Sequence, residues 1–135
     1  MIVVDSSAIV AIILNEPTGR ELARRLAAET ESLLSVANYV ETGQVLAQRN
    51  PTAVQRMLGD FRDFLSAASV SLAPIDEMQA RLALDARIRY GRGFGHPARL
   101  NYSDCFAYAL AKTRNLPLLF IGDDFTHTDI VSALA

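Results

Sequence analysis

The sequence predicts an α/β fold in which helices cover both faces of a parallel β-sheet. Two observations lead to this prediction. Short apolar runs recur along the chain, and the segments between them are long enough for the crossover helices that parallel strands require. The chain also has the length and composition of one globular domain, with 135 residues of which 50% are apolar and 21% charged. We therefore expect a single three-layer domain over residues 1–135.

Each expected strand is a short aliphatic run bordered by polar or turn-forming residues. The runs MIVV, SLLSV, VSLAP and LPLLFI occupy residues 1–4, 32–36, 70–74 and 116–121. The longest strongly apolar run, residues 8–14, is too short to cross a bilayer. The N-terminus lacks the basic region and cleavage site of a secretory signal. We expect a cytoplasmic protein with no membrane segment.

The first half of the chain contains three expected helices. Residues 6–14 are apolar nearly all round, which predicts a helix buried in the core or in a homodimer interface. Residues 18–29 follow Pro17 and carry Leu22 and Leu26 at helical spacing. Residues 37–49 form the helix expected after the second strand.

The second half of the chain contains three more expected helices. Asn50 and Pro51 predict the start of a helix over residues 51–67. The apolar stripe of that helix consists of Val54, Met57, Leu58, Phe61 and Leu65. The helix after the third strand has one apolar face, formed by Met78, Leu82 and Ala86. A glycine-rich loop over residues 91–101 leads to a helix that ends near Asn115.

Isolated acids occur in several otherwise uncharged segments. Asp5 is the only charge in residues 1–15, Glu41 the only one in 32–48 and Asp104 the only one in 100–111. An adjacent pair, Asp123 and Asp124, follows the last strand. Because the carboxyl ends of parallel strands face one edge of a sheet, where ligands bind, we expect these acids to converge there.

Each acid except one also has a purely structural interpretation. Asp5 can cap the helix that begins at Ser6, and Asp104 fits the third position of a helix capped by Asn101. One residue of the Asp123–Asp124 pair fits a turn. Glu41 lies inside a helix, where neither a cap nor a turn explains it.

Carboxylates gathered in a partly apolar cleft repel one another and raise each other's pKa unless a cation joins them. Oxygen ligands without nearby His or Cys suit Mg²⁺ or Mn²⁺. The chain has two histidines and one cysteine, Cys105, which excludes a disulfide framework and a cysteine metal cluster. Two such ions can clamp a phosphodiester while an activated water attacks it.

The motifs "IVVDSSAI", "VANYVETGQV", "LNYSDCFAYALA" and "LLFIGDDFTHTDI" resemble those of PIN-domain ribonucleases, and more closely the VapC toxins of toxin–antitoxin pairs. The resemblance extends from residue 2 to about residue 131. It implies a parallel sheet of four or five strands in an α/β/α domain, and an endoribonuclease that depends on Mg²⁺ or Mn²⁺. It also implies RNA as substrate and a small VapB-like antitoxin as inhibitor.

The resemblance also assigns roles to individual residues. Asp5, Glu41, Asp104 and one of Asp123 or Asp124 match the acidic quartet that holds the metal. Three polar residues match positions that support the site: Ser7, Asn101 and Thr128. The exposed faces of the 18–29 and 51–67 helices are candidate antitoxin contacts.

A group of arginines precedes Asp104. No acid occurs between Ala86 and Ser103, whereas Arg87, Arg89, Arg92 and Arg99 lie there with Tyr90, Phe94 and His96. Arginines contact phosphates and aromatic rings stack on unpaired bases, so we expect this stretch to guide RNA. A solvated helix end followed by a flexible loop is the structural alternative. The net charge of −2 excludes a protein coated with positive charge but not a local patch.

Other function classes fit the residues less well. A receiver-type signalling domain needs a lysine after the last strand, but the only lysine, Lys112, precedes it. A phosphatase with an aspartyl nucleophile needs a second aspartate at the position of Ser7. The remaining alternative is a metal-binding PIN-like interaction module without catalysis.

Overall fold

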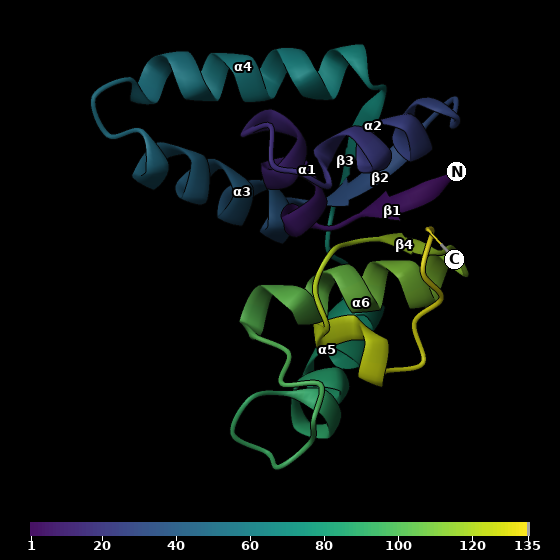
Figure 1. Ribbon diagram of the computed structural model, residues 1–135. Coiled ribbons are helices and arrows are strands. Elements are labelled where there is room, and N and C mark those ends of the chain that lie inside the picture. The colour runs from purple at the N-terminus through teal and green to yellow at the C-terminus, as the bar shows by residue number, and fades with distance from the viewer. Residues whose placement is uncertain (135) are drawn as a thin grey trace.

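A four-stranded parallel sheet lies at the centre of the computed structural model, which describes residues 1–134 (Figure 1). Its strands are β1 (Ile2–Val4), β2 (Ser32–Ser35), β3 (Val70–Ala73) and β4 (Leu118–Leu119), in the order β3-β2-β1-β4. Val3 on β1 pairs with Leu33 on β2 and with Leu118 on β4, and every strand pairing is parallel. The predicted parallel sheet is confirmed.

Helices cover both faces of this sheet. They are α1 (Ser6–Ile13), α2 (Gly19–Ala27), α3 (Val36–Arg49), α4 (Val54–Ala67), α5 (Glu77–Tyr90) and α6 (Tyr102–Arg114). A short 3₁₀ helix, Asp124–His127, follows β4. Figure 1 shows α1 to α4 on one side of the strands and α5, α6 and the 3₁₀ helix on the other. The predicted three-layer arrangement is therefore confirmed.

Two apolar cores, one on each face, follow from the alternation of side chains along the strands. Val3 and Leu33 pack toward α5 and α6. Their neighbours Val4 and Leu34 pack toward α1, α2 and α4. Because the residues of β1 and β2 are buried on both faces of the sheet, apolar residues follow one another directly, as in Ile2–Val4 and at Leu33 and Leu34, and do not alternate with exposed polar ones.

The start of α4 differs from the prediction. The helix begins at Val54 and not at residue 51, and its N-cap, Ala53, provides no side-chain hydrogen bond. Asn50 instead ends α3, with its N–H donating to the carbonyl of Ala47. The Asn-Pro pair thus marks the end of one helix and a turn. Within α4, Leu58 lies at the surface while most of the predicted stripe is buried.

The buried face of α5 also differs from the prediction. Met78, which the periodicity assigns to the apolar face, is 64% exposed. The buried residues are Gln79, Ala83, Ala86 and Tyr90. Small alanines on this face allow α5 to lie close against α6, so the contact uses small side chains and leaves several large ones outside.

The apolar helix α1 is used within the chain. Most of its residues, including Ala8, Ile9 and Ala11, are buried in the core beneath α2 and α4. Its composition is therefore explained by intrachain packing, and the homodimer stays a prediction. No helix within residues 1–134 has both the length and the apolar character needed to cross a membrane.

Candidate metal centre

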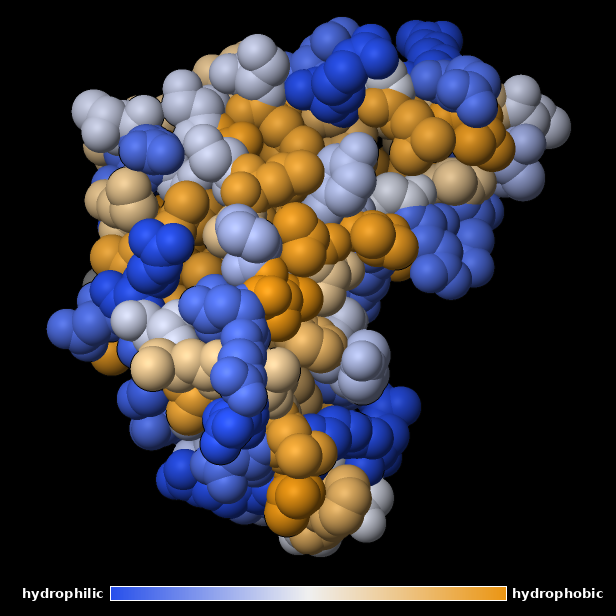
Figure 2. All heavy atoms as spheres, turned by 180° about the vertical axis from the view of Figure 1, so that it is seen from behind, coloured by the Kyte–Doolittle hydropathy of each residue, from blue (hydrophilic) through white to orange (hydrophobic). Residues whose placement is uncertain are grey.

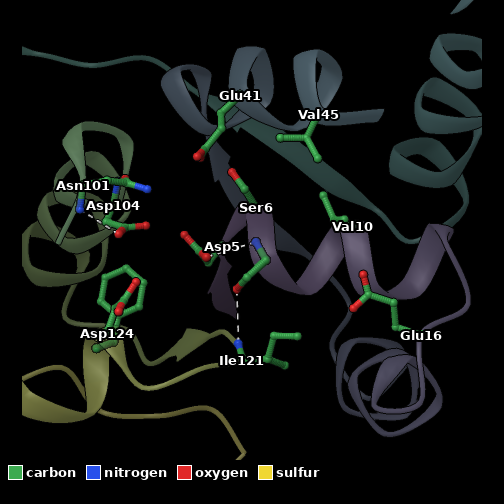
Figure 3. Close-up of a pocket in the computed structure, with 12 residues that line it drawn as sticks. Asp5, Ser6, Val10, Glu16, Glu41, Val45, Asn101, Asp104, Ile121 and Asp124 are labelled. Atoms are coloured by element: carbon green, nitrogen blue, oxygen red, sulfur yellow. Dashed lines mark hydrogen bonds between the residues drawn. The ribbon is translucent and has the colours of Figure 1, made fainter. Parts of the chain in front are cut away.

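A pocket of acidic residues opens at the carboxyl end of β1, between α1, α3 and α6 (Figure 3). Asp5, Glu41, Asp104 and Asp124 line it from four different segments of the chain. The other lining residues are Ser6, Ser7, Val10, Glu16, Val45, Asn101, Ile121 and Phe125. The fold thus brings together, at the sheet edge, acids that are up to 119 residues apart in the sequence (124 − 5).

Asp5 has both of the roles that its sequence position allows. It is the N-cap of α1, with Oδ2 accepting the Ser7 N–H at 3.0 Å. Its other oxygen, Oδ1, is buried without a hydrogen-bond partner. The residue is 3% exposed, and burial, assisted by the charge of Glu41, raises the pKa of Asp5 to about 6. A cap needs one oxygen, which leaves the second free for a ligand.

Asp104 also combines a cap with a place in the pocket. Asn101 Oδ1 accepts the Asp104 N–H and Asp104 Oδ2 accepts the Asn101 N–H, each at 2.9 Å, which completes a capping box at the start of α6. Burial is the main cause that raises the pKa of Asp104 to about 7. The charge of Asp5 is the second cause, and those of Glu41 and Asp124 add to it.

Glu41 enters the pocket from within α3, with Oε2 buried and unpaired. Its helix is held in place one turn earlier by Asn38, which is fully buried. The Asn38 amide Nδ2 donates to Ser6 Oγ at 3.3 Å and to the carbonyl of Ser103 at 3.2 Å. Asn38 therefore joins α3 to the helices that carry Asp5 and Asp104. No pattern in the sequence singles out Asn38 as part of the site.

The turn after β4 gives the adjacent residues Asp123 and Asp124 different surroundings. Asp124 lines the pocket, whereas Asp123 does not. The carbonyl of Asp123 accepts the N–H and the hydroxyl of Thr126, at 3.1 and 2.6 Å, and so shapes the turn. The preceding Gly122 has φ +94°, a conformation that favours glycine. Of the two residues that the sequence leaves as alternatives, the structure brings Asp124 to the other acids.

The supporting polar residues take different positions. Ser7 and Asn101 line the pocket, and Ser7 Oγ accepts the Ile121 N–H at 3.2 Å, which ties the chain after β4 to α1. Thr128 lies outside the pocket lining. Its hydroxyl donates to the carbonyl of Phe125 at 2.7 Å and accepts the Ile130 N–H, so it stabilises the turn behind Asp124.

The pocket fits a hard divalent cation by its chemistry. Two buried carboxylate oxygens, on Asp5 and Glu41, have no partner, and all of its negative charges are carboxylates. Within residues 1–134, no three acidic, histidine or cysteine side chains are gathered tightly enough to form a ligand set as they stand. Mutual repulsion keeps uncompensated carboxylates apart, so a cation would have to draw them inward.

The PIN-domain family model matches residues 2–131, almost the whole chain. The chain belongs to the PIN-domain family. Two curated relatives from Mycobacterium tuberculosis (strain ATCC 25618 / H37Rv) are ribonuclease VapC42 and ribonuclease VapC28. The first is 43% identical over 128 residues, 95% of each chain, and the second is 42% identical, covering 98% of this chain and 97% of the relative. The resemblance of this PIN domain to VapC ribonucleases is thereby confirmed.

Solved structures show the same fold. The crystal structure of VapC20 from M. tuberculosis, described as a sarcin-ricin loop cleaving toxin, superposes on this PIN domain with a TM-score of 0.76 at 17% identity, covering 97% of both chains. VapBC2 from Rickettsia felis, solved with a DNA fragment from its promoter, has a TM-score of 0.75 at 13% identity, covering 98% of this chain and 96% of the other. At these identities the match concerns the fold alone.

The arginines expected to guide RNA lie outside the acid pocket. The Arg87 guanidinium donates to the carbonyls of Leu100 and Arg92, at 2.8 and 3.1 Å, and so holds the glycine-rich loop to α5. Arg89, Arg92 and Arg99 are exposed. The cluster thus divides into one arginine that supports the loop and three whose charges face solvent.

A further acid, Glu16, lines the pocket of this PIN domain and was not identified in the sequence analysis. It follows the apolar run of α1 and is the first charge after Asp5. The uncharged segment between Asp5 and Glu16 therefore has an acid at each end. Since Asp5 is a candidate site residue, this pattern is the sequence signal for Glu16.

Proposed function

We propose that this PIN domain is a metal-dependent endoribonuclease, the toxin of a toxin–antitoxin pair, and that it hydrolyses RNA phosphodiester bonds. The observation that carries the proposal is the convergence of four carboxylates with two buried, unpaired oxygens at one sheet edge. Its relatives named VapC ribonucleases, at 42–43% identity over nearly the whole chain, support the reaction type. Because the proposed substrate is cellular RNA, we propose a cytoplasmic protein.

Asp5, Glu41, Asp104 and Asp124 would hold Mg²⁺ or Mn²⁺. When bound, the cation supplies an activated water and neutralises charge that develops on the phosphodiester. The chain contributes position and electrostatics. Caps fix Asp5 and Asp104, and Asn38 fixes the helix of Glu41 relative to both. Since the pKa values of Asp5 and Asp104 are raised to about 6 and about 7, loading the cation displaces protons that the metal-free pocket retains near neutral pH.

The exposed arginines at the end of α5 and in the glycine-rich loop, next to the pocket, would bind RNA phosphates. Arg89, Arg92 and Arg99 stand on the segment that runs directly into Asn101 at the pocket wall. Phosphate contacts of this kind add affinity and steer association without taking part in bond cleavage. Phe94, 56% exposed on the same loop, offers a ring on which an unpaired base can stack.

We also propose a VapB-like antitoxin as partner. The solved relatives include a toxin–antitoxin complex from Klebsiella pneumoniae, with a TM-score of 0.71 at 17% identity.

The exposed faces of α2 and α4 carry mostly charged residues. Larger apolar side chains are exposed on α3, α5 and α6, namely Val40, Leu84, Ile88 and Tyr102. Figure 2 shows apolar side chains gathered on the rear face between hydrophilic margins. Because of the exposed Val40, Leu84, Ile88 and Tyr102, the surface of α3, α5 and α6 is a better candidate contact than α2 or α4.

The test is RNA cleavage by the purified protein with Mn²⁺, with Mg²⁺ and with EDTA. We expect cleavage with either ion and none with EDTA. Asp5→Asn, Glu41→Gln and Asp124→Asn should each lower the rate by orders of magnitude. Asp85→Asn is the matched control, because Asp85 is an exposed acid on α5 outside the pocket. Metal binding without cleavage of any RNA would favour the non-catalytic interaction module instead.

A further inference from the structure

The acid pocket extends beyond the four carboxylates of the proposed metal centre. Figure 3 shows Val10 and Val45 beyond Asp5 and Glu41, and Glu16 at the far end near Val10. The pocket has a volume of about 320 Å³, which lies within the range of sites that hold small organic ligands. A metal ion fills a small part of that space. The remainder has apolar walls and one carboxylate.

The backbone holds Glu16 firmly at this end. The chain leaves α1 through Asn15, whose φ is +54°. The Glu16 N–H then donates to the carbonyl of Ala11, and the Glu16 carbonyl accepts the Gly19 N–H, both at 2.9 Å. A Cβ atom at Gly19 would lie 2.6 Å from the Ala11 carbonyl oxygen, so only glycine allows this approach of α2 to α1. These contacts fix the backbone of Glu16, and so the position of its Cα atom relative to the pocket.

The Glu16 carboxylate is available for a ligand. Within residues 1–134 it takes part in none of the ion pairs, which use other acids. It is half-buried and lines the pocket. The pKa of Asp104 is raised by the charges of Asp5, Glu41 and Asp124, the acids that share its end of the pocket. Glu16 lies at the opposite end of the pocket from Asp104 and Asp124, beside Val10 (Figure 3).

A carboxylate in this position selects a particular kind of group. It accepts hydrogen bonds and donates none, and it repels phosphate. The side chains of Val10 and Val45 offer apolar surface that the faces of a nucleobase can contact. Only guanine presents two adjacent donors, N1–H and the N2 amino group, to the two oxygens of one carboxylate. Adenine and cytosine present a single amino group beside an acceptor, and uracil one N–H between two carbonyls.

We propose that Glu16 is a specificity-determining residue that binds the Watson–Crick edge of a guanine next to the bond that is cut. The inference rests on the proposed ribonuclease function and adds its base preference. Single-stranded RNA is recognised through such edges when its bases are unstacked. Val10 and Val45 form the walls of the base site, and the Glu16 carboxylate accepts hydrogen bonds from the guanine N1–H and N2 amino group.

The experiment compares five short single-stranded RNAs that differ only in the nucleotide beside the cut. That nucleotide is guanosine, inosine, adenosine, cytidine or uridine. Inosine lacks only the N2 amino group. We expect kcat/KM to be roughly tenfold or more higher for guanosine than for any other nucleotide, inosine included, as for a good bidentate pair. Glu16→Gln should remove most of this preference, so that kcat/KM for the guanosine RNA falls to about that of the other RNAs. Glu21→Gln, on the exposed first turn of α2, is the matched control and should leave the preference unchanged.

Three outcomes would overturn the inference while the ribonuclease function stands. They are cleavage without preference for guanosine, a preference that survives Glu16→Gln, and a loss of Mn²⁺ affinity in Glu16→Gln comparable to that in Asp5→Asn. If the wild-type protein cleaves no RNA, the ribonuclease function fails, and binding of free guanosine and inosine is then decisive. Stronger shifts of the Val10 and Val45 methyl resonances with guanosine would support the base site. Equal shifts, or none, would overturn it.

Discussion

The acid pocket and the glycine-rich loop (residues 91–101) are neighbours in the fold but differ in how their charges are held. Asp5 and Asp104 are 3% and 7% exposed, and both are fixed by hydrogen bonds to the backbone. Arg92 and Arg99 of the loop are exposed. The buried carboxylates of the pocket therefore repel one another unless a proton or a cation compensates their charge, whereas the exposed charges of the loop cost the fold little. We infer that the pocket carries the chemistry and the loop contributes affinity.

The largest expected effect is that of Asp104→Asn, which removes charge from the pocket and leaves the cap. At the third position of a capping box a neutral amide oxygen can accept the N-cap N–H as a carboxylate does, so the Asn101 N–H still finds an oxygen at the same place. Because one of several mutually repelling carboxylates is gone, we expect the metal-free melting temperature to stay or to rise. Cleavage with Mn²⁺ should fall by orders of magnitude. Wild-type cleavage in this variant would leave Asp104 with capping as its only role.

The second prediction concerns the stability of the pocket against metal and pH. Saturating Mn²⁺ at one hundred times its dissociation constant should add about 2.7 kcal/mol to the free energy of unfolding. Without metal, Asp5 and Asp104 hold protons up to about pH 6 and about pH 7, whereas unfolded carboxyls lose them near 3.8. The folded state thus binds more protons in this window, and metal-free stability should fall as pH rises from about 4 to about 7.

Thermal melts across this pH range, with and without Mn²⁺, check both parts. Because protons compete with the cation, the stabilisation by Mn²⁺ should shrink as pH falls below about 7. Metal-free stability that rises between pH 4 and pH 7 would contradict the raised pKa values.

Asn38→Ala tests whether the helices of the pocket are held together by one side chain. The change removes the donor to Ser6 Oγ and to the Ser103 carbonyl. We expect a loss of about 1–3 kcal/mol in urea unfolding, because buried partners are left unsatisfied. Mn²⁺ affinity should also fall, since Glu41 is no longer held relative to Asp5 and Asp104. Gln48→Ala, at an exposed position of α3, is the control. A destabilised variant with unchanged Mn²⁺ affinity would limit Asn38 to a structural role.

The smallest expected effects lie in the arginine cluster, where the structure separates Arg87 from its neighbours. Arg87→Ala should cost about 1–3 kcal/mol of stability, because its guanidinium holds two loop carbonyls. Arg89→Ala with Arg92→Ala should change stability by about 0.5 kcal/mol or less each. The double variant should bind RNA more weakly and with a flatter salt dependence, while single-turnover cleavage at saturating RNA falls much less. A large loss of that step at unchanged affinity would contradict the guiding role.

Several features could be predicted from the sequence because local physics determines them. The strands are short aliphatic runs, and the helices between them follow from periodicity and caps. Asp5 and Asp104 could be recognised as site candidates because a charge in an otherwise uncharged, apolar segment needs a reason. Their second role as caps was equally visible, since the Asn101-to-Asp104 spacing is that of a capping box.

Other features were decided only by the tertiary structure. Asp123 and Asp124 are adjacent, and which one faces the pocket depends on the turn that Gly122, Thr126 and Phe125 impose. Glu16 enters the pocket because α2 lies against the end of α1 at Gly19, a contact between helices. Asn38 reads as an ordinary polar helix residue until α1 and α6 supply its partners. In each case a side chain's neighbours come from distant parts of the chain, and no local pattern encodes them.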